Sequence, residues 1–213
     1  MKNFIYDPSL VLYLPLHMLD GASFMSKDAY GHSCAVTGAL WTPQGGSFDG
    51  TDDYIGCGNP ASLNITDKVT VEAWVNSAGY AGDNRTIAGK HYSSYQLAVL
   101  NTGEIIFQLG VGGVDKMART GAGVAYIVDG EWYHLAGVYN KANVLLYVNN
   151  ILFTGDAATG DIDTNAYAVE IGRRPGPNDD WWKGLIGEVR IYNRALSSLE
   201  IQHNYLASKW RYQ

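Results

Sequence analysis

The sequence has few cysteines, no cluster of basic residues and no long apolar run. Its 15 Lys and Arg residues are outnumbered by 21 Asp and Glu residues, which gives a formal net charge of −6. A chain without a basic patch is a poor nucleic-acid binder, because neutralising phosphates supplies most of that affinity. The same charge disfavours acidic membrane surfaces, and no stretch reaches the roughly 18 apolar residues of a membrane span. We therefore predict neither nucleic-acid binding nor membrane insertion.

The two cysteines, Cys34 and Cys57, are too few for a disulfide framework. Each lies in a short apolar run, so two buried thiols and a single bridge remain alternatives. Residues 1–19 lack the charged start, the clean apolar core and the small-residue cleavage site of a signal peptide. We expect either a protein made without a secretion signal or a domain taken from a longer one.

Glycine and tyrosine are abundant, with 25 and 15 residues. Glycine serves turns and tyrosine serves pleated surfaces, which favours β structure. Short strand-like segments alternate with turn signals, and residues 69–75 place Val71 and Val75 on one face and Glu72 and Trp74 on the other. The expected strands are residues 10–16, 54–57, 69–75, 86–90, 95–100, 104–109, 133–139, 144–148, 151–154, 168–171 and 185–192. Without βα alternation, this pattern predicts two packed antiparallel sheets.

Two tight turns and one helix complete the expected elements. The pair Asn149 and Asn150 predicts a hairpin, as does the segment 101–103, Asn-Thr-Gly. Ser197 with Glu200 three residues later forms a capping box that predicts a C-terminal helix. We expect this helix to pack across one end of the sandwich. The chain has no internal repeat or linker-like stretch, so residues 1–213 are predicted to form one domain.

Five segments carry a resemblance to a known family. They are SFDGTDDYIGCG (47–58), VTVEAWVN (69–76), GEWYHLAGVYN (130–140), LLYVNN (145–150) and WKGLIGEVRIYNRALSSLEI (182–201). In order and spacing they resemble laminin-G-like domains of the concanavalin A-like lectin/glucanase superfamily, over nearly the whole chain. The resemblance implies an all-β, two-sheet antiparallel jelly-roll sandwich that commonly binds sugars, glycoproteins or other proteins without catalysis. Because a fold alone does not assign a function, the site must be argued from residues.

Acidic residues in turns suggest a calcium site. Ca²⁺ takes six to eight oxygen ligands, mostly carboxylates and loop carbonyls. The resemblance implies a bound Ca²⁺ whose first carboxylates fall near Asp20 and Asp28, with another at Asp49. A further acidic position of the family is Gly187 here, and Glu188 could substitute for it. The alternative is that these residues, together with Asp52 and Asp53, cap turns on an acidic surface.

The loop of residues 172–182 combines polar and aromatic side chains suited to sugar binding. Its candidate ligand-binding residues are Arg173, Arg174, Asn178, Asp180 and Trp181. Sugars are held by aromatic rings against their C–H faces and by polar groups on their hydroxyls. Neighbouring residues of an extended segment point in opposite directions, so we expect Trp182 in the core and Trp181 free to bind. The alternative for Trp181 is a hydrophobic plug over the end of the sandwich.

A second candidate rim segment is residues 78–95. It supplies Tyr80, His91 and Tyr92, and tyrosine gives a large contact area at low entropic cost. In the family's topology this segment could lie beside the 172–182 loop, and the alternative is that its residues are half-buried in the sheet. His134 is expected to be structural. The other histidines show no metal-ligand spacing, so no zinc site is predicted.

The sequence does not indicate an enzyme. Glucanases of the superfamily carry paired carboxylates on one strand in an E-x-D-x-(x)-E pattern, which Glu72, Glu104 and Glu188 do not form. Glycoside hydrolysis needs such a pair close together. No G-x-S-x-G elbow or phosphate-binding glycine loop is present either.

The leading hypothesis is a non-catalytic, lectin-like module that binds a glycan or polysaccharide, with Ca²⁺ as a possible cofactor. The alternative hypothesis is a structural or adhesive surface protein, such as a phage virion decoration or fibre component, that binds protein partners in a larger assembly. Phage surface proteins leave the cell by lysis and need no secretion signal. An extracellular or particle-surface location is therefore favoured.

Overall fold

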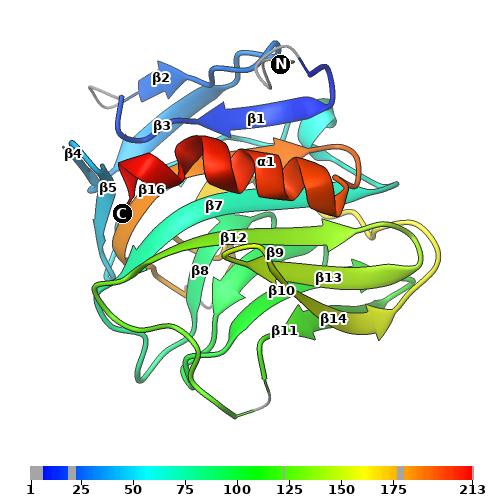
Figure 1. Cartoon of the computed structure of the whole chain (residues 1–213). Coiled ribbons are helices and arrows are strands. Elements are labelled where there is room, and N and C mark those ends of the chain that lie inside the picture. Colours follow the sequence, from blue (N-terminus) through cyan, green and yellow to red (C-terminus); the bar gives the residue numbers. More distant parts are fainter. Residues whose placement is uncertain (1–6, 19–22, 122, 177–179, 213) are drawn as a thin grey trace.

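The computed structural model describes residues 7–18, 23–121, 123–176 and 180–212. Two antiparallel sheets, called sheet A and sheet B, pack around one core and confirm the predicted sandwich (Figure 1). Sheet A has the order β14 (Ile151–Ala157), β13 (Asn143–Val148), β12 (Trp132–Tyr139), β7 (Val69–Ser77), β16 (Lys183–Tyr192), β5 (Gly45–Asp49) and β4 (Leu40–Thr42), with β1 (Leu10–Leu14) paired to β16. Sheet B has the order β11 (Val114–Arg119), β10 (Ile105–Val111), β9 (Tyr95–Val99), β8 (Arg85–Gly89), β15 (Glu170–Ile171), β6 (Tyr54–Gly56), β3 (Ser33–Thr37) and β2 (Ser23–Met25).

The alternation in β7 places its two faces in different surroundings, as the sequence predicts. Val71 and Val75 lie in the core between the sheets. Glu72 and Trp74 are buried on the opposite face of sheet A, beneath the C-terminal helix. The centre of sheet A is therefore covered on both faces, which explains why β7 is buried along almost its whole length.

The two predicted turns are confirmed. Asn149 and Asn150, between β13 and β14, have φ values of 48° and 67°. Gly103, between β9 and β10, has a φ of 83°. Asparagine and glycine adopt this left-handed region most readily, so these residues fix where each hairpin folds back.

The predicted helix is α1 (Ser198–Ser208), and its capping box between Ser197 and Glu200 is confirmed. The expectation that it covers one end of the sandwich is wrong, because α1 lies along the outer face of sheet A (Figure 1). The side chain of Ser208 accepts a hydrogen bond from Trp74 Nε1 at 2.9 Å. Ile201 joins a second, smaller apolar cluster with residues of β1, β12 and β16. The helix therefore buries both apolar and polar side chains on the outer face of sheet A.

Five strands were not expected from the sequence, namely β2, β3, β4, β5 and β11. Most are short, and the exposed or half-exposed positions of β2, β4 and β11 leave little apolar periodicity. The chain near the edges of the sheets therefore lacks the signal that marks central strands.

The two cysteines lie side by side as buried free thiols. Cys34 in β3 and Cys57 directly after β6 have their sulfur atoms 2.9 Å apart. Of the alternatives left by the sequence, the structure has two buried thiols. In the described residues, no helix is long and apolar enough to cross a membrane.

Candidate functional site

The loop of residues 172–182 connects β15 of sheet B to β16 of sheet A. Its ends are joined by a hydrogen bond from the backbone N–H of Trp182 to the carbonyl oxygen of Gly172, at 2.7 Å. Trp182 is 1 % exposed and lies in the core, as expected. The last part of the loop runs along β8, since Thr86 N–H donates to the carbonyl oxygen of Asp180 and Arg85 Nη1 donates to that of Trp181.

Beside this loop, a cavity of about 330 Å³ opens over the outer face of sheet B. Along β9, Leu97 and Val99 point into the core, so the alternate residues Gln96 and Ala98 point to this outer face. The lining consists of Asn84, Tyr92, Gln96, Ala98, Leu100, Ile106, Gln108, Asp115, Arg174 and Asp180. Three predicted ligand-binding residues, Tyr92, Arg174 and Asp180, therefore meet in one cavity.

Arg174 contacts Asp180 of its own loop and Tyr92 of the segment between β8 and β9. Its Nε lies 3.2 Å from Oδ2 of Asp180, and its guanidinium lies 5.5 Å from the centre of the Tyr92 ring. An arginine held by a carboxylate and an aromatic ring has a defined position. Tyr92, Arg174 and Asp180 thus form an ordered border of aromatic and polar groups.

The floor of the cavity contains one buried polar atom that has no partner among the described residues. Gln96 is 4 % exposed, and its Oε1 accepts no hydrogen bond within the described part of the chain. Gln108 on β10 lies directly opposite Gln96. Buried polar atoms normally have a hydrogen-bond partner, so Oε1 of Gln96 points to a ligand or water in the cavity.

Trp181 lies in a separate aromatic cluster next to the cavity. The guanidinium of Arg173 is 4.0 Å from the ring centre of Tyr54 and 5.1 Å from that of Trp181. Arg173 also forms an ion pair with Glu170. The half-buried Trp181 is thus supported by Arg173, and this Tyr54–Arg173–Trp181 cluster forms a second aromatic surface on sheet B.

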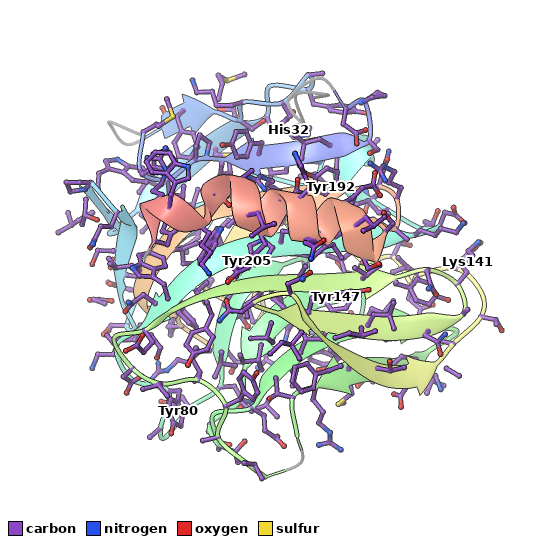
Figure 2. All side chains as sticks on the ribbon, in the orientation of Figure 1. His32, Tyr80, Lys141, Tyr147, Tyr192 and Tyr205 are labelled. Carbon is purple, nitrogen blue, oxygen red and sulfur yellow. The ribbon has the colours of Figure 1, made fainter. Side chains whose placement is uncertain are left out.

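Two further predicted residues do not line the cavity. Tyr80 packs on the main core and close to Gly103, at the lower end of the molecule in Figure 2. His91 follows β8 with a φ of 86°, and its ring stacks on Tyr167 with centres 4.9 Å apart. Burial, and then the charge of Arg174, lowers the pKa of His91. The ring centres of His91 and Tyr92 are 4.0 Å apart, so His91 packs against Tyr92 and helps to hold it in place.

The predicted metal ligands lie in different places. Asp49, Asp52 and Asp53, called the acidic triad, place carboxylate oxygens within 4.8 Å of one another and are the one such group found in the described residues. Asp28 instead accepts hydrogen bonds from the backbone of Tyr13 and of residues 30 and 31. Glu188 is buried in an ion pair with Arg190, at 2.8 Å. Asp20 and Asn178 lie outside the described residues.

The acidic triad offers carboxylate oxygens, which are the ligands that a hard cation such as Ca²⁺ prefers. Burial, followed by the charges of Asp49 and Asp52, raises the pKa of Asp53. Oxygen atoms of Asp49 and Asp53 also accept backbone hydrogen bonds within the turn, as capping residues do. Three carboxylates with a crowded negative charge are the donor set that Ca²⁺ takes, with loop carbonyls or water completing its six to eight ligands.

A buried polar cluster beneath α1 has a structural arrangement. Glu72 accepts a hydrogen bond from Asn204 of α1 at 2.9 Å and lies near Arg190 and His134, at 3.8 and 3.9 Å. Burial raises the pKa of Glu72 to about 7 and lowers that of His134 to about 3. The helix closes these groups off from solvent, as expected for a structural His134.

Gln96, Gln108 and Asp115 were not recognised from the sequence. The available signal was weak: Gln96 and Gln108 are polar residues within apolar strands, on the face opposite Leu97 and Phe107. Asp115 belongs to β11, which was not expected. Only the pairing of β9, β10 and β11 brings these residues to one surface.

The two packed antiparallel sheets, with one helix on sheet A, define a jelly-roll sandwich of the concanavalin A-like class. A laminin G family model, described as concanavalin A-like lectin/glucanases superfamily, matches residues 49–202, which is more than half of the chain. The chain therefore belongs to this family. No curated protein matches the sequence.

Solved structures share the fold at low sequence identity. A Trypanosoma rangeli sialidase in complex with sialic acid has a TM-score of 0.72 at 17% identity, over 97% of this chain and 34% of that one. The receptor binding domain of botulinum neurotoxin C/D mosaic serotype has a TM-score of 0.71 at 16%, over 93% and 51%. The binding domain of botulinum neurotoxin DC in complex with SialylT has 0.71 at 13%, over 95% and 52%. The chain spans about half the length of the toxin domains and a third of the sialidase.

Proposed function

We propose that this chain is a non-catalytic, lectin-like module that binds a glycan or polysaccharide in the cavity over sheet B. The observation that carries the proposal is the buried, unpartnered Oε1 of Gln96 at the floor of that cavity. A hydroxyl of a sugar donates the hydrogen bond that this oxygen lacks. Leaving such an atom unsatisfied costs about 1–3 kcal/mol, and a bound hydroxyl recovers part of that cost.

The surroundings of the cavity support a sugar as its ligand. Polar side chains make up most of the lining, which suits a ligand with many hydroxyls, and Ala98, Leu100 and Ile106 lie between them. Tyr92 supplies an aromatic ring at the border. The Tyr54–Arg173–Trp181 cluster lies next along the loop and would contact a further unit of a longer chain. Two structural relatives are known in complex with sialic acid and with SialylT, which supports a glycan as the ligand here.

The carboxylates of the central strands support binding without catalysis. Glu72 and Glu188 are almost fully buried beneath α1, where Asn204 and Arg190 hold them. Glu104 accepts hydrogen bonds from Gly123 and Thr102 and so ties down a loop. A glycosidase needs two carboxyl groups on either side of the substrate bond. These three groups are held for structure instead.

Ca²⁺ is the cofactor that we propose for the acidic triad. Asp49, Asp52 and Asp53 would hold it, and the bound cation would offset the burial and the neighbouring charges that raise the pKa of Asp53. The ion would brace the turn between β5 and β6 and act on stability. Sugar binding in the cavity over sheet B is then expected to persist when Ca²⁺ is removed.

A second candidate function is that of an adhesive or structural surface protein. Leu199 and Leu206 of α1 are 74% and 59% exposed, and Trp210, in the turn of 3-10 helix that follows α1, is 70% exposed. Exposed apolar side chains that follow one face are typical of protein interaction sites. A botulinum toxin binding domain of this fold is known in complex with rat synaptotagmin II. An extracellular or particle surface, such as a virion, would suit both functions, and co-sedimentation with particles tests this candidate.

The test of the proposed function is a glycan array with four proteins. Wild type is expected to bind a defined set of glycans, and Tyr92→Ala is expected to weaken that binding roughly tenfold or more. Trp181→Ala should weaken binding of longer glycans. Trp210→Ala, just after α1, is the matched control and should bind as wild type does. Equal binding by Tyr92→Ala and the control would refute the site.

A further inference from the structure

The buried thiols of Cys34 and Cys57 face each other across two neighbouring strands. β3 pairs with β6 in antiparallel register, with Ala35 opposite Gly56, and the next position along places Cys34 opposite Cys57. The two sulfur atoms are 2.9 Å apart, so both side chains point into the same space. Cys34 is 0% exposed and Cys57 is 2% exposed. Each thiol therefore has the other within reach and is shielded from solvent.

This placement suits a covalent bond between the two sulfur atoms. Opposite residues of an antiparallel pair have Cα atoms about 4.5 or 5.5 Å apart, inside the roughly 4.4–6.8 Å that disulfides span. The sulfur atoms of Cys34 and Cys57, at 2.9 Å, must approach by about 0.9 Å to reach the length of a disulfide bond. A bond is prevented where the side chains point apart, and these two point toward each other.

The bond would join the edge of sheet B to the rest of the sheet. β3 is paired to β6 at three positions, from Ala35 to Thr37. β2 is the last strand of sheet B and pairs with β3. An edge held by few paired positions opens more readily than the centre of a sheet. A bond between Cys34 and Cys57 would fix the β2–β3 edge to β6 and close a ring of residues 34–57.

The pair is protected from reaction while this edge is closed. The hydrogen bond with Cys34, followed by burial, raises the pKa of the Cys57 thiol. The thiolate is the form that attacks a disulfide, so the raised pKa and the burial both slow the reaction. Opening of the β2–β3 edge, or folding of a new chain, gives an oxidant access to the two thiols.

We propose that Cys34 and Cys57 are the site of an internal disulfide, which forms with a low-molecular-weight disulfide as oxidant and fixes the β2–β3 edge to β6. The thiolate of one cysteine attacks the oxidant, which forms a mixed disulfide and releases one molecule of thiol. The second cysteine attacks the protein sulfur of that mixed disulfide and releases a second molecule of thiol. The protein loses two protons and two electrons, and the oxidant takes them up.

This inference goes beyond the proposed glycan binding and does not depend on it. Neither cysteine is among the described residues that line the cavity over sheet B. The proposed function can therefore fail while the disulfide forms, and the reverse is equally open to observation.

The experiment unfolds the reduced protein in urea and refolds it at low concentration with oxidised glutathione or with a reducing agent. With oxidised glutathione, mass spectrometry should show the loss of two hydrogen atoms and no alkylation of either cysteine under denaturing conditions. The bridged protein should melt roughly 6–12 °C above the reduced protein, and a reductant should reverse this shift. Amide hydrogen exchange should slow more in β2 and β3 than in β13 of sheet A.

Cys34→Ala and Cys57→Ala are the matched variants, because each removes one partner and leaves the other in place. Neither should gain stability from oxidative refolding, and the comparison within wild type stands even if a variant fails to fold. Cysteines of the wild type that remain open to alkylation after oxidative refolding would overturn the proposal, as would a bond between two chains in place of the internal one. A bridged protein with an unchanged or lower melting temperature would contradict the fixing of the edge.

Discussion

Replacing Glu72 with glutamine should change how stability depends on pH. The carboxyl group lies beneath α1 with Asn204 as hydrogen-bond partner and Arg190 at 3.8 Å. Burial raises its pKa from 4.5 to about 7, in spite of the opposing effect of Arg190. The raised pKa means that folding favours the protonated form, which a glutamine side chain imitates in shape and in its carbonyl acceptor.

The size and sign of the effect follow from that pKa. A folded-state pKa above the unfolded value gives a stabilising contribution that is complete below about pH 4.5 and is lost as pH rises through about 7. At about 1.4 kcal/mol per pH unit, ionising Glu72 costs the folded state about 3 kcal/mol. Glu72→Gln avoids this cost. Part of this cost is already present at pH 5, so relative to wild type the variant should gain about 2–3 kcal/mol between pH 5 and pH 8.5.

The assay is urea unfolding at both pH values, followed by tryptophan fluorescence. His134, whose burial lowers its pKa to about 3, works in the opposite direction: its contribution is complete above about pH 6.5 and is lost as pH falls. That loss occurs in both proteins and cancels in the comparison. Glu131→Gln, at an exposed position, is the control and should show no gain. An equal stability difference between Glu72→Gln and wild type at both pH values would refute the reasoning.

Two further predictions concern packing and calcium. Gly137→Ala places a methyl group against the buried ring of Phe107 and should destabilise the protein by about 1–3 kcal/mol in urea unfolding, whereas Gly56→Ala, with only ordinary contact to Tyr54, should cost far less. Ca²⁺ at about 100 times its Kd should raise the melting temperature by roughly 5–10 °C. Mg²⁺ should not do so, and Asp52→Asn should abolish the effect. An unchanged melting temperature with Ca²⁺ would contradict the calcium proposal.

Central parts of the fold could be predicted from the sequence because their signals are local. The alternation of β7, the Asn149–Asn150 turn and the Ser197–Glu200 capping box each depend on a few neighbouring residues. The place of α1 could not be predicted, because it depends on a surface assembled from β1, β7, β12 and β16. Edge strands such as β11 were not predicted, because their sequences lack a regular alternation of apolar and polar residues.

The candidate site was predictable only in its loop residues. Tyr92, Arg174 and Asp180 stood out by residue type within turn-rich segments, and the structure places them in one cavity. Gln96 and Gln108 carry no such signal, because they come together only when β9 pairs with β10. The calcium ligands were predicted from a family resemblance and lie far apart in the sequence. The acidic triad instead comes from a single turn, residues 49–53.

The most direct test of the central claim is an NMR titration with a glycan that the array identifies, following the side-chain amide signals of Gln96 and Gln108. These amides lie at the floor of the cavity over sheet B. The proposed function predicts that both signals shift with the same saturation curve, while the indole signal of Trp210, just after α1, stays in place. Shifts at Trp210 without shifts at the two glutamines would contradict the account and move the binding site to the helix face.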